Sequence, residues 1–252
     1  MKKILSVAVA FAALTMTFSG CSMLSSGDPQ QEQYENNQLR NYDFSQLEFI
    51  QLEDPYEGQP IATIKTSVGT MKVMLFPEQC PNTVQNFINR ANEGYYNNNN
   101  VFLVYPDYYF MAGSSAEDGS SGATDDGNPI PNECSVKLWP FKGAMLAYND
   151  ALGYGDSRYF IANTVEMTDE ELEEIRAAVD ENGNKLVPEE LIQAFIDNGA
   201  LPGLSGSYTV FGQTIEGIEV LEKIIKVEID EKTMLPKEKI TIESVEISEY
   251  HA

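Results

Sequence analysis

Histidine and cysteine are scarce in this chain of 252 residues. The single histidine, His251, stands next to the last residue, and the three cysteines, Cys21, Cys80 and Cys134, are far apart in the sequence. A Ser/His or Cys/His nucleophilic pair therefore has no suitable base, and a zinc site lacks ligands. We expect neither a metal ion nor a cofactor.

Basic residues are also few. The chain has 16 lysines and arginines against 39 aspartates and glutamates, which gives a net charge of −23. Such a charge repels the phosphate backbone of nucleic acids, so we expect no nucleic-acid partner. The hydrophobic share of 42% is ordinary for a chain with a folded core. We expect the protein to be a monomer.

The N-terminus has the pattern of an export signal. Lys2 and Lys3 precede an apolar run over residues 4–18, and two small residues lead to Cys21. The run is short for a membrane span but has the length of a signal peptide. Its ending, FSGC, resembles the bacterial lipobox, in which the cysteine is lipidated. The sequence therefore predicts a signal peptide over residues 1–21 and a lipoprotein held through Cys21 on the outer face of a bacterial cell membrane. An uncleaved anchor or an ordinary signal peptide is the alternative.

Two cysteines remain after lipidation. Exported proteins commonly carry disulfides, so Cys80 and Cys134 could pair. Both could equally be small buried residues with free thiols. The sequence does not decide between these alternatives.

Residues 22–59 predict a flexible tether. They are rich in Gln, Asn, Ser, Asp and Glu, and few apolar residues occur before Leu47, so the segment cannot bury enough surface to fold. About 30 flexible residues have a mean reach on the order of 30 Å. The exception is LEFIQL, residues 47–52, which either docks on the domain as an extra strand or remains an apolar patch of the tether.

Regular structure is expected from Pro60 onward. Alternating side chains on both sides of SVGT predict a hairpin over residues 60–77, and helical spacing predicts a helix over residues 82–94 with Asn82 or Thr83 as its cap. An insertion over about residues 164–202 should hold two helices as a small hairpin. The first has the Thr168 and Glu171 spacing of a capping box, and the second runs from Pro188 toward a terminating glycine.

Five stretches of the domain form an ordered set: IATIKTSVGTMKVMLFPEQCPNTVQNF, GYYNNNNVF, PIPNECSVKLWPFKGAM, SRYFIA and YTVFGQTIEGIEVLEKI. In this order they resemble the conserved blocks of cyclophilins, which are peptidyl-prolyl cis-trans isomerases. The resemblance implies a mainly β fold over residues 60–250, in which eight antiparallel strands close into a barrel with a helix over each end. It also implies that the aromatic segment of residues 102–115 forms much of a proline pocket.

Family positions transfer residue by residue. Phe102 matches a family Phe, Leu103 replaces a His, and Val104 replaces the catalytic Arg. Gly203 replaces a Trp that is usual in the family. The substrate-binding residues that the resemblance implies are Val104, Tyr109, Phe110, Ala112, Tyr148, Asn149, Phe160, Leu204 and Tyr208.

Arg158 is the candidate catalytic residue. It replaces a family Gln that lies beside the catalytic Arg, and it precedes Phe160 by two residues, so both side chains should share one face of a strand. One interpretation is that the catalytic charge has moved from position 104 to position 158. The other is a surface ion pair with Asp156.

These observations leave three functional hypotheses. The first is a prolyl isomerase that assists the folding of exported proteins at the cell surface, because slow prolyl isomerisation limits folding. The second is a non-catalytic module that binds proline-containing peptides or unfolded exported proteins. The third is a structural barrel in which the aromatic side chains are only core.

Overall fold

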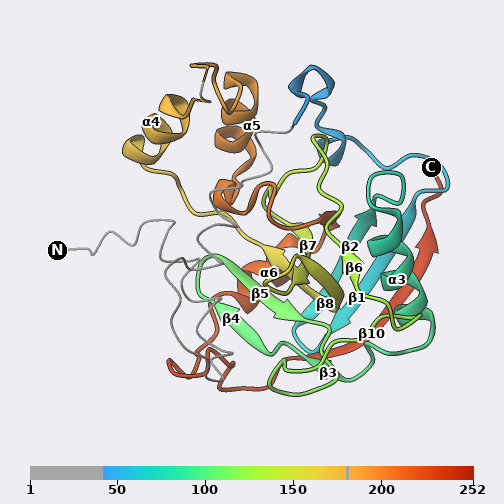
Figure 1. The fold of residues 1–252 in the computed structure, drawn as a ribbon. Coiled ribbons are helices and arrows are strands. Elements are labelled where there is room, and N and C mark those ends of the chain that lie inside the picture. The colour runs from blue at the N-terminus through green and yellow to red at the C-terminus, as the bar shows by residue number, and fades with distance from the viewer. Residues whose placement is uncertain (1–41, 180–181) are drawn as a thin grey trace. The chain divides into compact units, whose positions relative to one another are not determined.

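The computed structural model describes residues 42–179 and 182–252 (Figure 1). The predicted signal peptide, Cys21 and the first part of the predicted tether lie outside these residues. The strands are β1 (Pro60–Thr66), β2 (Gly69–Leu75), β3 (Asn99–Asn100), β4 (Leu103–Tyr105), β5 (Tyr109–Ala112), β6 (Ile130–Pro131), β7 (Ala144–Asn149), β8 (Tyr154–Ala162), β9 (Val210–Glu216) and β10 (Thr241–Glu249). The helices are α3 (Pro81–Asn92), α4 (Asp169–Ala177), α5 (Glu189–Asn198) and α6 (Ile218–Ile224), with short 3-10 turns η2 (Phe44–Gln46), η3 (Ile50–Leu52) and η4 (Pro202–Leu204).

The described strands form one antiparallel sheet. Their order is β3-β10-β1-β2-β9-β7-β8-β5-β4, and β6 pairs with β8. The prediction of a mainly β fold is therefore confirmed, although the described residues contain ten strands where the resemblance implied eight. The two strands that end this path, β3 and β4, are joined by the short segment Val101 and Phe102. The first and last strands of this order, β3 and β4, are therefore neighbours along the chain.

The predicted hairpin and first helix are present, but the helix is capped differently from the prediction. β1 pairs with β2 from Ile61 to Thr66, and α3 begins at Pro81. Neither Asn82 nor Thr83 caps it; instead the Glu133 carboxylate accepts hydrogen bonds from their backbone N–H groups at 3.1 and 2.8 Å. A carboxylate there also complements the positive end of the helix dipole. Helix α3 packs against β8 and β10.

The insertion contains both predicted helices, α4 and α5, which stand together beside the strands in Figure 1. Thr168 and Glu171 form the predicted capping box at the start of α4. Arg176 of α4 forms an ion pair with Glu189 of α5 at 2.9 Å. Local sequence signals therefore sufficed to place these helices.

The last part of the predicted tether, from Tyr42 onward, is folded onto the domain. The aromatic rings of Tyr42 and Phe44 contact the ring of Trp139 at centroid distances of 5.7 and 6.2 Å. LEFIQL adds no strand; its residues Ile50–Leu52 form η3, and Gln51 is 3% exposed. Buried hydrogen bonds to a distant segment hold it there, which composition alone does not reveal.

The cysteines of the described residues carry free thiols. The Cys80 thiol donates to the Phe76 carbonyl at 3.1 Å, and burial raises its pKa well above the ordinary value. Burial also raises the pKa of Cys134 to about 11. The sequence left open whether Cys80 and Cys134 form a disulfide, and in the structure they do not.

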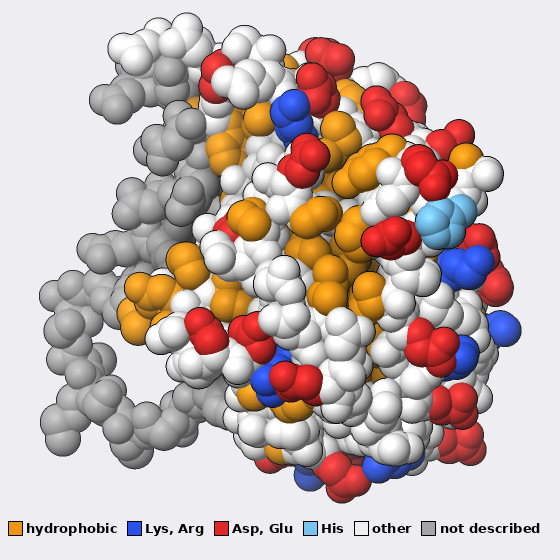
Figure 2. Space-filling model, turned by 90° about the vertical axis from the view of Figure 1, so that its right-hand side faces the viewer, with side chains coloured by type: hydrophobic (Ala, Val, Ile, Leu, Met, Phe, Trp, Pro, Cys, Tyr) orange, Lys and Arg blue, Asp and Glu red, His pale blue; other side chains and the backbone are white. Residues whose placement is uncertain are grey.

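The surface carries the acidic excess seen in the sequence. Figure 2 shows a face with Asp and Glu side chains spread over its margin and hydrophobic side chains gathered in its middle. None of the described helices is both long and apolar enough to cross a bilayer.

Candidate functional site

Strand β8 carries the two side chains on which the predicted site depends. Along Tyr154–Ala162 the side chains alternate between the two faces of the sheet. Tyr159 points into the core, where its ring contacts Phe87 at 5.8 Å. Arg158 and Phe160 therefore lie on the opposite face, as the sequence predicted.

Aromatic rings gather around Phe160. Its ring lies 5.3 Å from the ring of Tyr109 and 5.2 Å from the ring of Tyr208. Tyr105 extends the row, with its ring stacked 5.7 Å from that of Tyr109. The structure thus brings together three predicted substrate-binding residues, Tyr109, Phe160 and Tyr208, which we call the ring cluster.

Three other predicted residues lie on the wrong face for this cluster. Val104 pairs with Phe110, and Phe110 pairs with Ile161, so these side chains point to the core face. Ala112 pairs with Tyr159 on that same face. Val104, Phe110 and Ala112 are all 0% exposed, and the structure does not bring them to the ring cluster.

The residues that sequence reasoning missed are Leu103 and Met111. Leu103 pairs with Met111, and Met111 pairs with Phe160, so all three side chains share the face of the ring cluster. The missed signal is strand alternation: Tyr109 and Phe110 are neighbours in a strand and cannot face the same side. A shift of one residue in the alignment of this segment exchanges the two faces.

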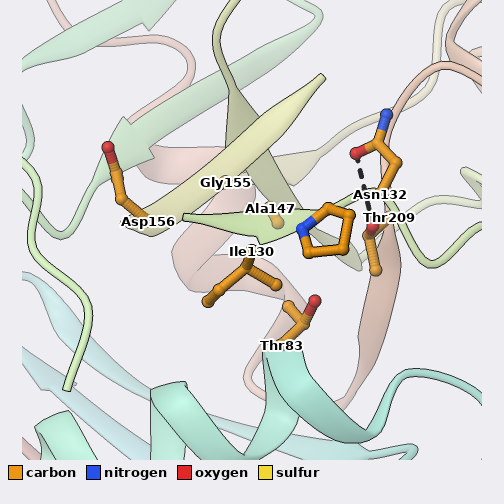
Figure 3. Close-up of a pocket in the computed structure, with 8 residues that line it drawn as sticks. Thr83, Ile130, Asn132, Ala147, Gly155, Asp156 and Thr209 are labelled. Atoms are coloured by element: carbon orange, nitrogen blue, oxygen red, sulfur yellow. Dashed lines mark hydrogen bonds between the residues drawn. The ribbon is translucent and has the colours of Figure 1, made fainter. Parts of the chain in front are cut away.

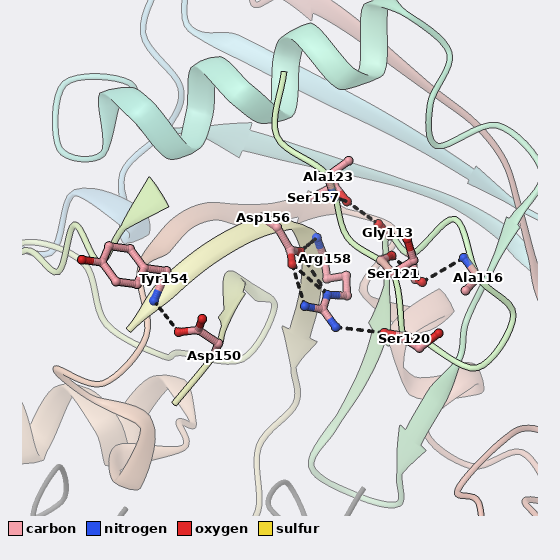
Figure 4. A network of polar contacts seen from close by, with 12 residues as sticks. Gly113, Ala116, Ser120, Ser121, Ala123, Asp150, Tyr154, Asp156, Ser157 and Arg158 are labelled. Carbon is pink, nitrogen blue, oxygen red and sulfur yellow. Dashed lines mark hydrogen bonds and ion pairs between the residues drawn. The ribbon is translucent and has the colours of Figure 1, made fainter. Parts of the chain in front are cut away.

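Arg158 is held in a network of polar contacts (Figure 4). Its Nε donates to the two carboxylate oxygens of Asp156 at 3.0 and 3.1 Å, and Nη2 donates to Oδ2 at 2.6 Å. Nη1 donates to the Gly119 carbonyl at 2.9 Å. An ion pair with Asp156, as the sequence suggested, is therefore present, but it does not lie on the surface, because the two side chains are only 12% and 20% exposed. These contacts use one N–H of each guanidinium nitrogen and fix the plane of the group.

The guanidinium also lies over the ring of Tyr148, with Cζ 4.0 Å from the ring centroid. Burial lowers the pKa of Arg158, but the hydrogen bonds and negative charge of Asp156 outweigh this and raise it overall. Burial raises the pKa of Tyr148, although the nearby Arg158 opposes the shift. The pair therefore presents a permanent cation on a neutral phenol.

Asn149 and Leu204 lie on segments that lead to the ring cluster. The Asn149 side-chain amide donates to the Ser207 carbonyl at 2.8 Å and to Asn132 Oδ1 at 2.9 Å. The first bond holds the chain just before Tyr208 directly, and the second holds it through Asn132, whose side-chain amide also donates to the Ser207 carbonyl at 2.8 Å. Leu204 ends η4, and its carbonyl accepts the N–H of Ser207.

A family model for the cyclophilin type peptidyl-prolyl cis-trans isomerase/CLD family matches residues 61–247. The chain belongs to this family. A candidate peptidyl-prolyl cis-trans isomerase of Staphylococcus saprophyticus is 32% identical over 202 residues, which cover 80% of this chain and 98% of that protein. A candidate bifunctional phosphatase/peptidyl-prolyl cis-trans isomerase of Streptococcus pyogenes is 30% identical, but the match covers only 42% of that longer protein and 80% of this chain.

The fold of this cyclophilin chain is also similar to a solved structure. A cyclophilin type isomerase of Cryptosporidium parvum, crystallised in the presence of the dipeptide Ala-Pro, has a TM-score of 0.57 and 20% sequence identity. The similarity covers 76% of this chain and 99% of that one. At this identity the likeness supports the cyclophilin fold alone.

The cyclophilin domain also has a narrow recess, shown in Figure 3. Its volume is about 190 Å³, which includes the part open to solvent. Its lining residues are Thr83, Ile130, Pro131, Asn132, Ala147, Gly155, Asp156 and Thr209. None of them belongs to the ring cluster, so this recess is not the predicted groove.

Proposed function

We propose that this cyclophilin domain catalyses cis-trans isomerisation of X-Pro bonds in extended segments of exported proteins. The observation that carries the proposal is the arrangement on β8, where Phe160 lies in the ring cluster and Arg158 lies two residues earlier on the same face. A proline ring would pack on the aromatic rings, and the guanidinium would lie beside the amide. No proton transfer is needed, so the lack of a suitable histidine does not count against the proposal.

The chemistry explains why a fixed cation helps. Rotation about a prolyl amide breaks resonance against a barrier of about 18–20 kcal/mol. In the twisted state the nitrogen gains a lone pair that can accept a hydrogen bond. Arg158 keeps one N–H on each terminal nitrogen beyond its contacts with Asp156 and Gly119. A donor that acts only on the twisted state lowers the barrier without tighter substrate binding.

The test is a protease-free isomerisation assay on short X-Pro peptides with varied X. We expect a rate above the uncatalysed one and weak peptide binding, with dissociation constants of roughly micromolar to millimolar, because burying one proline ring contributes only a few kcal/mol. Bulky X should be disfavoured, since Tyr148 stands where the family has a small residue. Absence of both catalysis and peptide binding would contradict the proposal.

A non-catalytic peptide-binding module is the second candidate. Two observations favour it. Arg158 forms an ion pair with Asp156, and Leu103, which pairs with Met111 on the face of the ring cluster, is apolar. A groove with apolar walls and a neutralised cation can hold a proline without accelerating its rotation. Peptide binding with no rate above background in the same assay would select this candidate.

We further propose that the domain is a lipoprotein held on the outer face of a bacterial cell membrane through Cys21. The support is the signal-like sequence over residues 1–21. A Cys21→Ser variant should be released from the membrane or retained as uncleaved precursor, because the lipid anchor of the mature chain begins at this residue. Fractionation of cells that express parent or variant measures this. Equal membrane association and equal processing of both forms would overturn the proposal.

A further inference from the structure

Residues 42–52, here called the docking segment, belong to a hydrophobic cluster that also includes helix α5. The docking segment contributes Tyr42, Phe44, Leu47 and Phe49, which are partly buried. The buried members of the cluster are Trp139, Phe141, Val187, Leu191, Ile192, Ala194, Phe195 and Ala200. One apolar cluster therefore joins three stretches that are far apart in the sequence: the docking segment, residues 139–141 and the insertion.

Trp139 is the centre of this cluster. Its ring contacts those of Tyr42 and Phe44 from the docking segment and that of Phe195 from α5 at 5.9 Å. Buried Gln51 accepts a hydrogen bond from the Trp139 N–H and donates to the Trp139 carbonyl at 2.9 Å. The docking segment thus fixes both the side chain and the backbone of Trp139.

Two connections lead from this cluster to the ring cluster. The chain after α5 pairs with the residues that follow Trp139: the Leu201 N–H donates to the Pro140 carbonyl and the Lys142 N–H to the Gly199 carbonyl, both at 2.9 Å. From Leu201 the chain runs directly through η4 to Tyr208. No long flexible stretch separates the two clusters.

The second connection passes through β9. Gln51 Nε2 donates to Gln213 Oε1 at 3.0 Å, and Gln213 Nε2 donates to the Lys142 carbonyl at 2.8 Å. Strand β9 begins at Val210, just after Tyr208. The buried amide of Gln51 therefore supports the strand that follows Tyr208 directly, and the stretch that precedes Tyr208 through Trp139 and its neighbour Pro140.

We propose that the docking segment positions the groove wall formed by Leu204 and Tyr208, so that its docking and peptide binding are thermodynamically coupled. Gln51 is the main positioning residue, because it bonds to both connections. The proposal rests on the proposed function in one respect, namely that the ring cluster receives a proline. Coupling is reciprocal: if docking strengthens peptide binding, peptide binding strengthens docking by the same factor.

The test uses the full chain and the fluorescence of Trp139, which is the only tryptophan. In Gln51→Ala we expect Trp139 emission to move to longer wavelength and the KM for an X-Pro peptide to rise about tenfold, which corresponds to about 1.4 kcal/mol. The kcat should stay within about twofold, since Arg158 is untouched. Titrating the parent with the peptide should change Trp139 emission although Trp139 lies outside the ring cluster.

Tyr56→Ala is the matched control, because this exposed aromatic residue follows the docking segment and should change neither emission nor KM. Amide hydrogen exchange over residues 201–209 gives a readout independent of activity and should be faster in Gln51→Ala. Shifted emission with unchanged KM and unchanged exchange would overturn the proposal. If the parent neither binds nor isomerises any proline peptide, the proposed function fails, and exchange alone then decides whether the docking segment positions residues 201–209. If Gln51→Ala does not fold, Phe44→Ala carries the same comparison.

Discussion

Replacing Leu103 with arginine is expected to raise the isomerisation rate by about 10²-fold, since one charged donor aimed at a transition state contributes about 10²–10³ in rate. Leu103 is partly exposed and faces the same side of the sheet as Met111 and Phe160. A guanidinium at this position would therefore reach the ring cluster from β4. The measurement is kcat and KM for an X-Pro peptide in the protease-free assay.

The same substitution one residue later should fail. Val104 is 0% exposed and faces Phe110 in the core, so Val104→Arg would bury a charge that has no partner. The expected loss is several kcal/mol, against a total stability of about 5–15 kcal/mol for an ordinary domain. Thermal unfolding should show Val104→Arg to be largely unfolded while Leu103→Arg remains folded.

Leu103→Gln is the control for a long polar side chain without charge, and it should gain little rate. A folded Leu103→Arg that binds peptide with unchanged kcat would contradict the expected role of this face. A stable Val104→Arg with raised kcat would show that the groove lies on the other face of β4.

The part of the fold that the sequence predicted well is the part set by neighbours along the chain. The first hairpin and the two insertion helices follow from alternation, helical spacing and the Thr168 capping box, which are all local. The errors arise where distant groups act. Glu133 caps α3 across the fold, and Gln51 docks on Trp139, so neither could be found from the nearby residues.

The candidate site was predicted in part for a related reason. Tyr109, Phe160 and Tyr208 meet because the family blocks fix which strands are neighbours. The face on which each side chain lies depends on the strand register. If the alignment with the family is shifted by one residue in β4 or β5, it assigns core side chains to the groove. Counting alternation from Tyr109 would have selected Met111.

Replacing Arg158 with glutamine is expected to lower kcat by about 10²-fold while KM changes little, because the donor acts mainly on the twisted amide. Asp156 raises the pKa of Arg158, so the group stays charged and the parent's rate should not vary between about pH 6 and pH 9. Arg158→Lys keeps the charge but loses the planar fork that Asp156 and Gly119 orient, so it should recover only part of the rate.

The matched control is Arg176→Gln, which breaks an exposed arginine–glutamate pair in the insertion and should leave kcat unchanged. Melting temperatures separate catalysis from folding, because Arg158→Gln leaves Asp156 partly buried without its cation. A folded Arg158→Gln enzyme with the parent's kcat would show that the ion pair is structural. In that case the ring cluster alone binds the proline, and any remaining catalysis must come from another donor.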